Sequence, residues 1–166
     1  MIELDRALFV IQKRGQIGFT LIELMVTIAV LAIIAALAAP SFQSMRDNQK
    51  LKLSLMEMRT GIQQGRSRAI IARSPTLVCP DTVAEVTCGA NIANYASLSQ
   101  SQKDDSVLRP VIDDSVTIKS GSVDHFIFNP QGITVSGTIT LCSGNKSVSL
   151  TVNGPGVITQ TDGGVC

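Results

Sequence analysis

The dominant feature of the hydropathy pattern is an apolar run over residues 19–45 that holds one charged side chain, Glu23. The basic residues Arg6, Lys13 and Arg14 precede it. A helix needs about 20 apolar residues to cross a bilayer core, so this run is long enough to span a membrane. The pattern predicts a helix that is apolar all round, with its basic flank on the cytoplasmic side.

Two residues of this run interrupt an otherwise ordinary membrane segment. A carboxylate within such a segment costs about 2.5–3.5 kcal/mol on insertion scales, so Glu23 indicates either a specific role or a place at the membrane surface. Pro40 removes one backbone hydrogen bond from the helix, and we expect a kink near residues 36–40.

From residue 46 onward the pattern becomes amphipathic. Spacings of four and three residues draw one apolar stripe, which a helix over residues 19–73 would bury in the protein's own core. Basic residues fall mostly away from that stripe, and Ser74 before Pro75 ends the helix. The stripe consists of Leu51, Leu55, Met58, Ile62, Gly65 and Ala69.

After Pro75 the chain reads as short strands and turns. We expect strands at 76–79, 107–109, 116–119, 123–128, 138–142 and 147–152, turns at 129–132 and 143–146, and a polar loop at 81–105. Short turns between strands favour antiparallel pairing. The predicted fold class is therefore α+β: a long N-terminal membrane-spanning helix whose C-terminal half packs on an antiparallel β-sheet head.

Composition and charge refine this organisation. A chain of 166 residues supports one modest domain plus an anchor. Residues 46–73 carry seven Lys/Arg and two Asp/Glu, whereas residues 74–166 carry four and eight. A basic stem therefore bears an acidic head. All four cysteines follow the apolar run, which favours an oxidising compartment.

The start of the apolar run carries a recognisable motif. Residues 18–24 read GFTLIEL, which resembles the processing site of type IV prepilins and type II secretion pseudopilins. The resemblance implies that a prepilin peptidase cleaves after Gly18 and methylates Phe19, and that the apolar run remains as an anchor. It also implies that Glu23 pairs with the N-terminal amine of a neighbouring subunit, and that Pro40 kinks the helix. A buried carboxylate needs such a cationic partner.

The head resembles one group within this class. The matching segments read SRAIIARSPTLVC (67–79), VLR (107–109), FIFNPQG (126–132) and GTITLC (137–142), and they are similar to GspH/FimT-type heads. That group contains the FimT and FimU minor pilins and the GspH minor pseudopilin. The resemblance implies a structural subunit, either a minor pilin of the initiation or tip complex of a type IV pilus or a minor pseudopilin of a type II secretion system.

The same resemblance implies an organisation and a set of partners. Residues 1–18 form a cleaved leader, 19–45 a transmembrane and assembly helix, and 46–166 a periplasmic head. The protein is expected in the bacterial inner membrane as a single-pass subunit that enters a pilus or pseudopilus. Its partners are other minor and major pilins or pseudopilins, the prepilin peptidase and the inner membrane.

The sequence disfavours three other interpretations. A DNA-uptake pilin of the FimT type carries a basic Gly-Arg-x-Arg turn near its C-terminus, but this chain has no Lys or Arg after Lys146, so DNA binding is not expected. An exported enzyme is disfavoured because His125 is the single histidine and no nucleophile set accompanies it. We expect neither a cofactor nor a metal.

An ordinary signal peptide cleaved near residues 36–40 leaves Glu23 unexplained.

Four cysteines allow three pairings. We favour Cys79–Cys88 and Cys142–Cys166. The first pair flanks a short polar segment, so its loop closes readily. The second ties the last residue to a strong predicted strand, and a chain end frays unless it is held.

Overall fold

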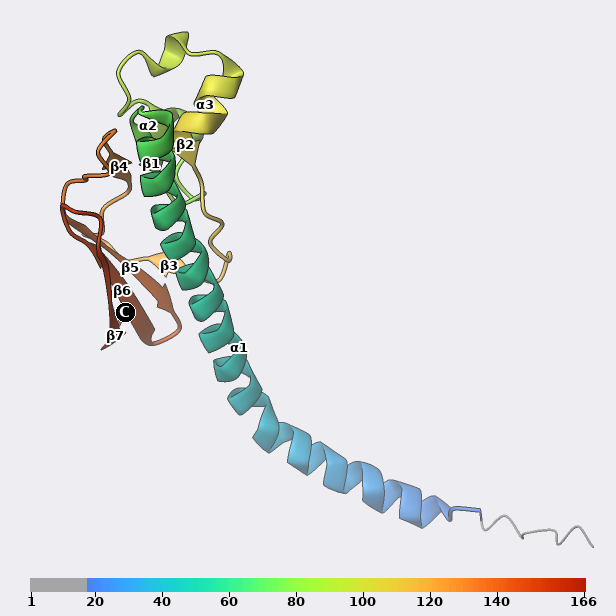
Figure 1. Cartoon of the computed structure of the whole chain (residues 1–166). Coiled ribbons are helices and arrows are strands. Elements are labelled where there is room, and N and C mark those ends of the chain that lie inside the picture. Colours follow the sequence, from blue (N-terminus) through green and yellow to red (C-terminus); the bar gives the residue numbers. More distant parts are fainter. Residues whose placement is uncertain (1–17) are drawn as a thin grey trace, which may run out of the picture. The chain divides into compact units, whose positions relative to one another are not determined.

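The computed structural model describes residues 18–166, apart from the side chains of residues 37–40. The chain divides into two compact units, Met1–Pro40 and Ser41–Cys166, and helix α1 (Leu21–Ala72) contributes to both (Figure 1). Within the described residues no single helix meets the length and apolarity of a membrane span, whereas the pair Leu21–Ala36 and Ser41–Ala72 does so together. The predicted leader lies outside the described residues except for Gly18, and the kink near Pro40 stays a prediction.

Helix α1 ends where the sequence indicated. Arg73 adopts a left-handed φ of 51°, a conformation that closes a helix, and Pro75 follows two residues later. The apolar stripe is confirmed as core, because Met58, Ile62 and Ala69 are fully buried. A Cβ atom at Gly65 would lie 2.2 Å from Val78 Cγ2, so only glycine lets the helix approach the sheet this closely.

The first sheet has the strand order β2-β1-β4, formed by β2 (Val107–Leu108), β1 (Thr76–Val78) and β4 (Phe126–Phe128). β1 and β4 are antiparallel, but β1 and β2 are parallel. This one pair departs from the antiparallel pairing that short turns favour, because a long crossover joins β1 to β2. Parallel neighbours require such a crossover.

That crossover was predicted as a loop and is partly helical. It contains α2 (Glu85–Gly89), the 3₁₀ helix η1 (Tyr95–Ser97) and α3 (Gln100–Ser106). A capping box between Ser99 and Gln102 starts α3. The S-x-x-Q spacing of that box was visible in the sequence, but no apolar periodicity followed it.

The second sheet is antiparallel throughout and has the order β3-β5-β6-β7. Its strands are β3 (Thr117–Ile118), β5 (Gly137–Ser143), β6 (Lys146–Val152) and β7 (Ile158–Gly164). The turn between β5 and β6 uses Gly144 at φ 57°, as the first central residue of a type II′ hairpin turn requires. Strand β7 was not predicted, because it is polar, ends in two glycines and shows no alternation.

Two apolar clusters hold the head together. The larger one joins the buried face of α1 to both sheets and includes Met58, Ile62 and Phe128. The smaller one lies beneath the crossover and contains Leu77, Cys79, Cys88, Tyr95 and Val107. The predicted α+β class is confirmed, with the C-terminal half of α1 packed on the β-sheet head.

Candidate functional site

The start of α1 presents an exposed aromatic residue and an exposed carboxylate. The hydroxyl of Thr20 accepts a hydrogen bond from the backbone N–H of Glu23 (3.2 Å), so Thr20 caps the helix. Phe19 is 80% exposed. The Glu23 carboxylate makes no hydrogen bond or ion pair with a described residue. It lies in the first helical turn, where the helix dipole favours a negative charge.

The apolar side chains that follow are exposed around the whole circumference of α1. Leu21, Ile22, Leu31 and Ile33 are all more than 60% exposed. Burial of apolar surface contributes a favourable free energy of about 25 cal/mol per Å². An exposed apolar surface of this kind therefore indicates a site that contacts lipid or other apolar helices. Glu23 is the single charged residue of the run.

Gly18, Phe19 and Pro40 are the other N-terminal positions with predicted roles. Gly18 and Phe19 precede the helix in an irregular segment, and a Cβ atom at Gly18 would meet no described atom within 4 Å. Pro40 lies inside α1, but its side chain is among those not described. The roles of all three residues stay predictions.

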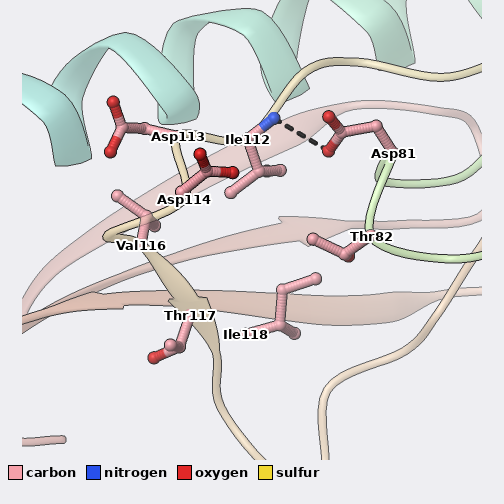
Figure 2. Close-up of a pocket in the computed structure, with 8 residues that line it drawn as sticks. All are labelled: Asp81, Thr82, Ile112, Asp113, Asp114, Val116, Thr117 and Ile118. Carbon is pink, nitrogen blue, oxygen red and sulfur yellow. Dashed lines mark hydrogen bonds between the residues drawn. The ribbon is translucent and has the colours of Figure 1, made fainter.

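A shallow pocket of about 500 Å³ on the head gathers three aspartates (Figure 2). Asp81 accepts a hydrogen bond from the Ile112 backbone N–H (2.9 Å), and Asp113 points toward α1. Asp113 Oδ1 accepts from Ser115 Oγ (2.6 Å) and Lys50 Nζ (3.1 Å). Two of the carboxylates therefore stabilise the head itself. No set of three metal-ligating side chains occurs among residues 18–166 as described.

The hydrogen bonds from Ser115, together with Lys50, lower the pKa of Asp113 from 3.8 to about 2. A carboxyl group whose pKa is lower in the folded than in the unfolded protein stabilises the folded state at pH values above its unfolded pKa. This contribution is lost as the pH falls toward the folded pKa. We expect Asp113→Asn to lower stability at neutral pH. The difference from wild type should shrink between about pH 4 and pH 2.

Urea unfolding across this pH range measures the effect. Asp114→Asn is the matched control, because Asp114 lines the same pocket but makes no hydrogen bond with a described residue. A wild-type advantage over Asp113→Asn that is unchanged at pH 2 contradicts the assignment.

A second polar cluster anchors the crossover and was missed at the sequence level. Tyr95 Oη donates to Glu85 Oε1 (2.9 Å), and Lys103 Nζ lies 5.5 Å from the centre of the Tyr95 ring. Burial and then the Glu85 contact raise the pKa of Tyr95 to about 12. These polar contacts lie at the edge of the smaller apolar core, which includes Tyr95. In the sequence, only the presence of a single tyrosine pointed to them.

Both arginines of the sequence GRSR at residues 65–68 donate hydrogen bonds to carbonyls of the head. Arg66 Nε donates to Gly132 O (3.2 Å), and Arg68 Nη1 donates to Asp104 O (3.4 Å). Arg109 likewise donates to the carbonyls of Asp81 and Val83. These side chains therefore hold turns and the crossover in place.

The structure also shows the partners of the four cysteines and of His125. Disulfides join Cys79 to Cys88 and Cys142 to Cys166, the pairing favoured from the sequence. His125 Nδ1 lies 2.7 Å from Asp124 Oδ1, on the segment that leads into β4.

Comparisons with known proteins found two matching family models and one similar solved structure. A family model described as Type II transport protein GspH matches residues 54–156, and one described as Prokaryotic N-terminal methylation motif matches residues 13–39. A search of curated proteins found no match. Among solved structures, the chain is similar to the type IV minor pilin FimU of Pseudomonas aeruginosa strain PAO1. The identity is 16% and the TM-score 0.47, over 72% of this chain and 97% of that chain.

The GspH model covers more than half of the 166 residues. The protein therefore belongs to the GspH family, the structural subunits with a GspH/FimT-type head found among minor pilins and pseudopilins, and it carries the prokaryotic N-terminal methylation motif.

Proposed function

We propose that the protein is a minor pilin that enters the initiation or tip complex of a type IV pilus. The observation that carries the proposal is the exposed apolar helix from Leu21 to Ala36, which holds Glu23 as its one charge and continues into a GspH-type head. Residues 19–45 anchor the protein in the inner membrane as a single span. Residues 46–166 form the periplasmic head, where an oxidising environment suits the two disulfides.

Maturation follows from the methylation motif. A prepilin peptidase removes residues 1–18 by cleavage after Gly18 and methylates the new N-terminus at Phe19. Two observations support this step: the motif match over residues 13–39, and the irregular conformation of residues 18–20, where a Cβ atom at Gly18 would meet no described atom within 4 Å.

Assembly then depends on Glu23. The carboxylate makes no ion pair with a described residue and lies in an apolar run, where an unpaired charge is costly. The N-terminal amine of a neighbouring subunit provides the positive charge that pairs with this carboxylate once both helices lie in the same apolar environment. Pro40 loosens the helix so that the apolar half adapts to its neighbours.

Three arginines of the head hold its own fold together, so these residues do not support a DNA receptor function. Arg66, Arg68 and Arg109 donate to carbonyls of the same chain, so their cations are committed to the fold. Binding to nucleic acid requires several cations free to neutralise phosphates.

A type II secretion pseudopilin is the second candidate, because the matching family model is described as a type II transport protein. Deletion of the gene in its source organism separates the two. We expect the loss of surface pili, restored by the wild-type gene but not by the Glu23→Ala gene, with protein secretion unchanged. Lost secretion with normal piliation favours the pseudopilin, and normal piliation with normal secretion contradicts both candidates.

A further inference from the structure

The two disulfides of the head differ in their exposure to solvent. Cys79 and Cys88 are 0% and 1% exposed and belong to the smaller apolar cluster beneath the crossover. Cys142 is 5% exposed, whereas its partner Cys166 is an exposed residue. Thiol–disulfide exchange requires the attacking sulfur to reach one of the two bonded sulfurs. Of the four cysteines, all of which the structure describes, Cys166 alone offers this access.

The Cys142 half of the tail disulfide, the bond between Cys142 and Cys166, is held by the second sheet. On β5, Cys142 is the register partner of Thr117 on β3 and of Ser147 on β6. Strands on both sides therefore keep this residue in place whether or not its sulfur is bonded. A thiol that approaches from solvent meets Cys166, and Cys142 becomes the leaving group.

The Cys166 half of the bond lies outside the sheet. The ladder between β6 and β7 ends at Gly164, and Cys166 lies two residues beyond it. Besides the disulfide, a hydrogen bond from Lys119 Nζ to Val165 O (2.7 Å) holds this segment. The ammonium group of Lys119 therefore lies beside the peptide bond that precedes Cys166. A nearby cation favours the thiolate form of an incoming thiol, which is the reactive form.

We propose that Cys166 is a thiol-exchange site through which a thiol opens the tail disulfide and leaves Cys79–Cys88 closed. The incoming thiolate attacks Cys166 Sγ, and a new S–S bond forms as the bond to Cys142 breaks. Cys142 leaves as a thiolate and takes a proton from solvent. The site lies entirely within the head, so the inference holds for a pilin and for a pseudopilin alike.

A dithiol completes the reduction. Its second thiolate attacks the sulfur of the reductant in the mixed disulfide, and Cys166 leaves as a thiolate that takes a proton from solvent. Two electrons pass from the dithiol, which becomes a disulfide, to the protein, which gains two thiols. A monothiol stops at the mixed disulfide until a second molecule attacks or Cys142 closes the bond again.

Opening the tail disulfide releases β7 in particular. β7 is the edge strand of its sheet and pairs only with β6, and its residues after Ile158 are all exposed. Ile158 is the one residue of β7 that packs against the larger apolar cluster. The redox state of one bond therefore determines whether β7 is held, while the remainder of the head stays folded.

Reduction of the oxidised full-length protein in detergent micelles tests the site. Samples taken at intervals from reduced glutathione or dithiothreitol are quenched with acid, alkylated and mapped as non-reduced peptides. The tail disulfide should open at least about tenfold faster than Cys79–Cys88, and glutathione should be attached to Cys166. Equal rates, faster opening of Cys79–Cys88, attachment to Cys142 or resistance of both bonds each overturn the proposal.

Two further arms identify the cause of the selectivity and the source of the thiol. In denaturing urea the two disulfides should open at similar rates, because unfolding exposes all four sulfurs. A tenfold difference that persists in urea overturns the assignment to exposure. Reduced thioredoxin, a protein dithiol, should open the tail disulfide as dithiothreitol does. Opening by dithiothreitol alone supports the site with small thiols as its reductants.

Hydrogen exchange tests the release of β7. After selective opening, amides of Ile158–Gly164 should exchange at least about tenfold faster, while those of β5 should keep their rates. The matched control is the double substitution Cys142→Ser and Cys166→Ser, in which β7 should exchange rapidly with or without thiol. Unchanged exchange of β7 after opening overturns the proposed release. Loss of protection across the whole head also overturns it, because β7 is then not the unit that is freed.

Discussion

Glu23→Ala leaves the protein in the membrane but removes it from the filament complex. The substitution deletes a carboxylate that costs about 2.5–3.5 kcal/mol in an apolar span, so membrane insertion does not suffer. Assembly is weakened, because the variant lacks the carboxylate that pairs with the N-terminal amine of a neighbouring subunit. Breaking one side of a buried ion pair costs about 3–5 kcal/mol, so recovery with other subunits should fall at least about 100-fold.

Co-purification of tagged protein with other minor subunits measures this loss, with membrane fractionation as the parallel readout. Glu57→Ala is a matched control, because Glu57 is an exposed glutamate on the same helix but lies in the head. Glu23→Gln keeps the side-chain shape and should behave like Glu23→Ala. Undiminished recovery of Glu23→Ala removes the docking role, and full rescue by Gln assigns the role to shape instead of charge.

The double substitution Cys142→Ser and Cys166→Ser should produce the largest loss of head stability. The disulfide closes a loop with a sequence separation of 24, and it ties the chain end to strand β5. The chain-entropy model gives about 3 kcal/mol for a loop of this length. Strand β7 should loosen most, because it is an exposed edge strand that pairs only with β6.

Urea unfolding of the oxidised wild-type and variant proteins gives the difference in free energy of unfolding. Non-reducing peptide mapping identifies the bonds themselves. Replacing Cys79 and Cys88 with serine perturbs a different region, since both cysteines are buried in the smaller core beneath the crossover. A stability change below about 1 kcal/mol makes the tail disulfide dispensable, and a Cys79 linkage to Cys142 or Cys166 refutes the pairing.

The sequence predicted the helix and its buried stripe because both follow one strong rule. Met58, Ile62 and Gly65 follow the helical spacing of the stripe, so a single periodicity marked both the element and its buried face. Strands β5 and β6 were equally visible, since their apolar residues alternate on either side of a glycine turn.

The features that were missed depend on tertiary contacts. Strand β7 is polar, so its sequence carries no strand pattern. It is extended because it pairs with β6 and because the Cys166 disulfide holds its end. The parallel pairing of β1 and β2 follows from a crossover whose helices are too short to show a period.

Intact mass measurement and N-terminal sequencing of the mature protein test the central claim most directly, because anchoring and Glu23 docking both require the apolar run to survive maturation. We expect a mature chain that begins at Phe19, carries one N-terminal methyl group and retains every residue of the apolar run. A mature chain that begins at Pro40 or later contradicts it, since the protein would then be a secreted head without an anchor.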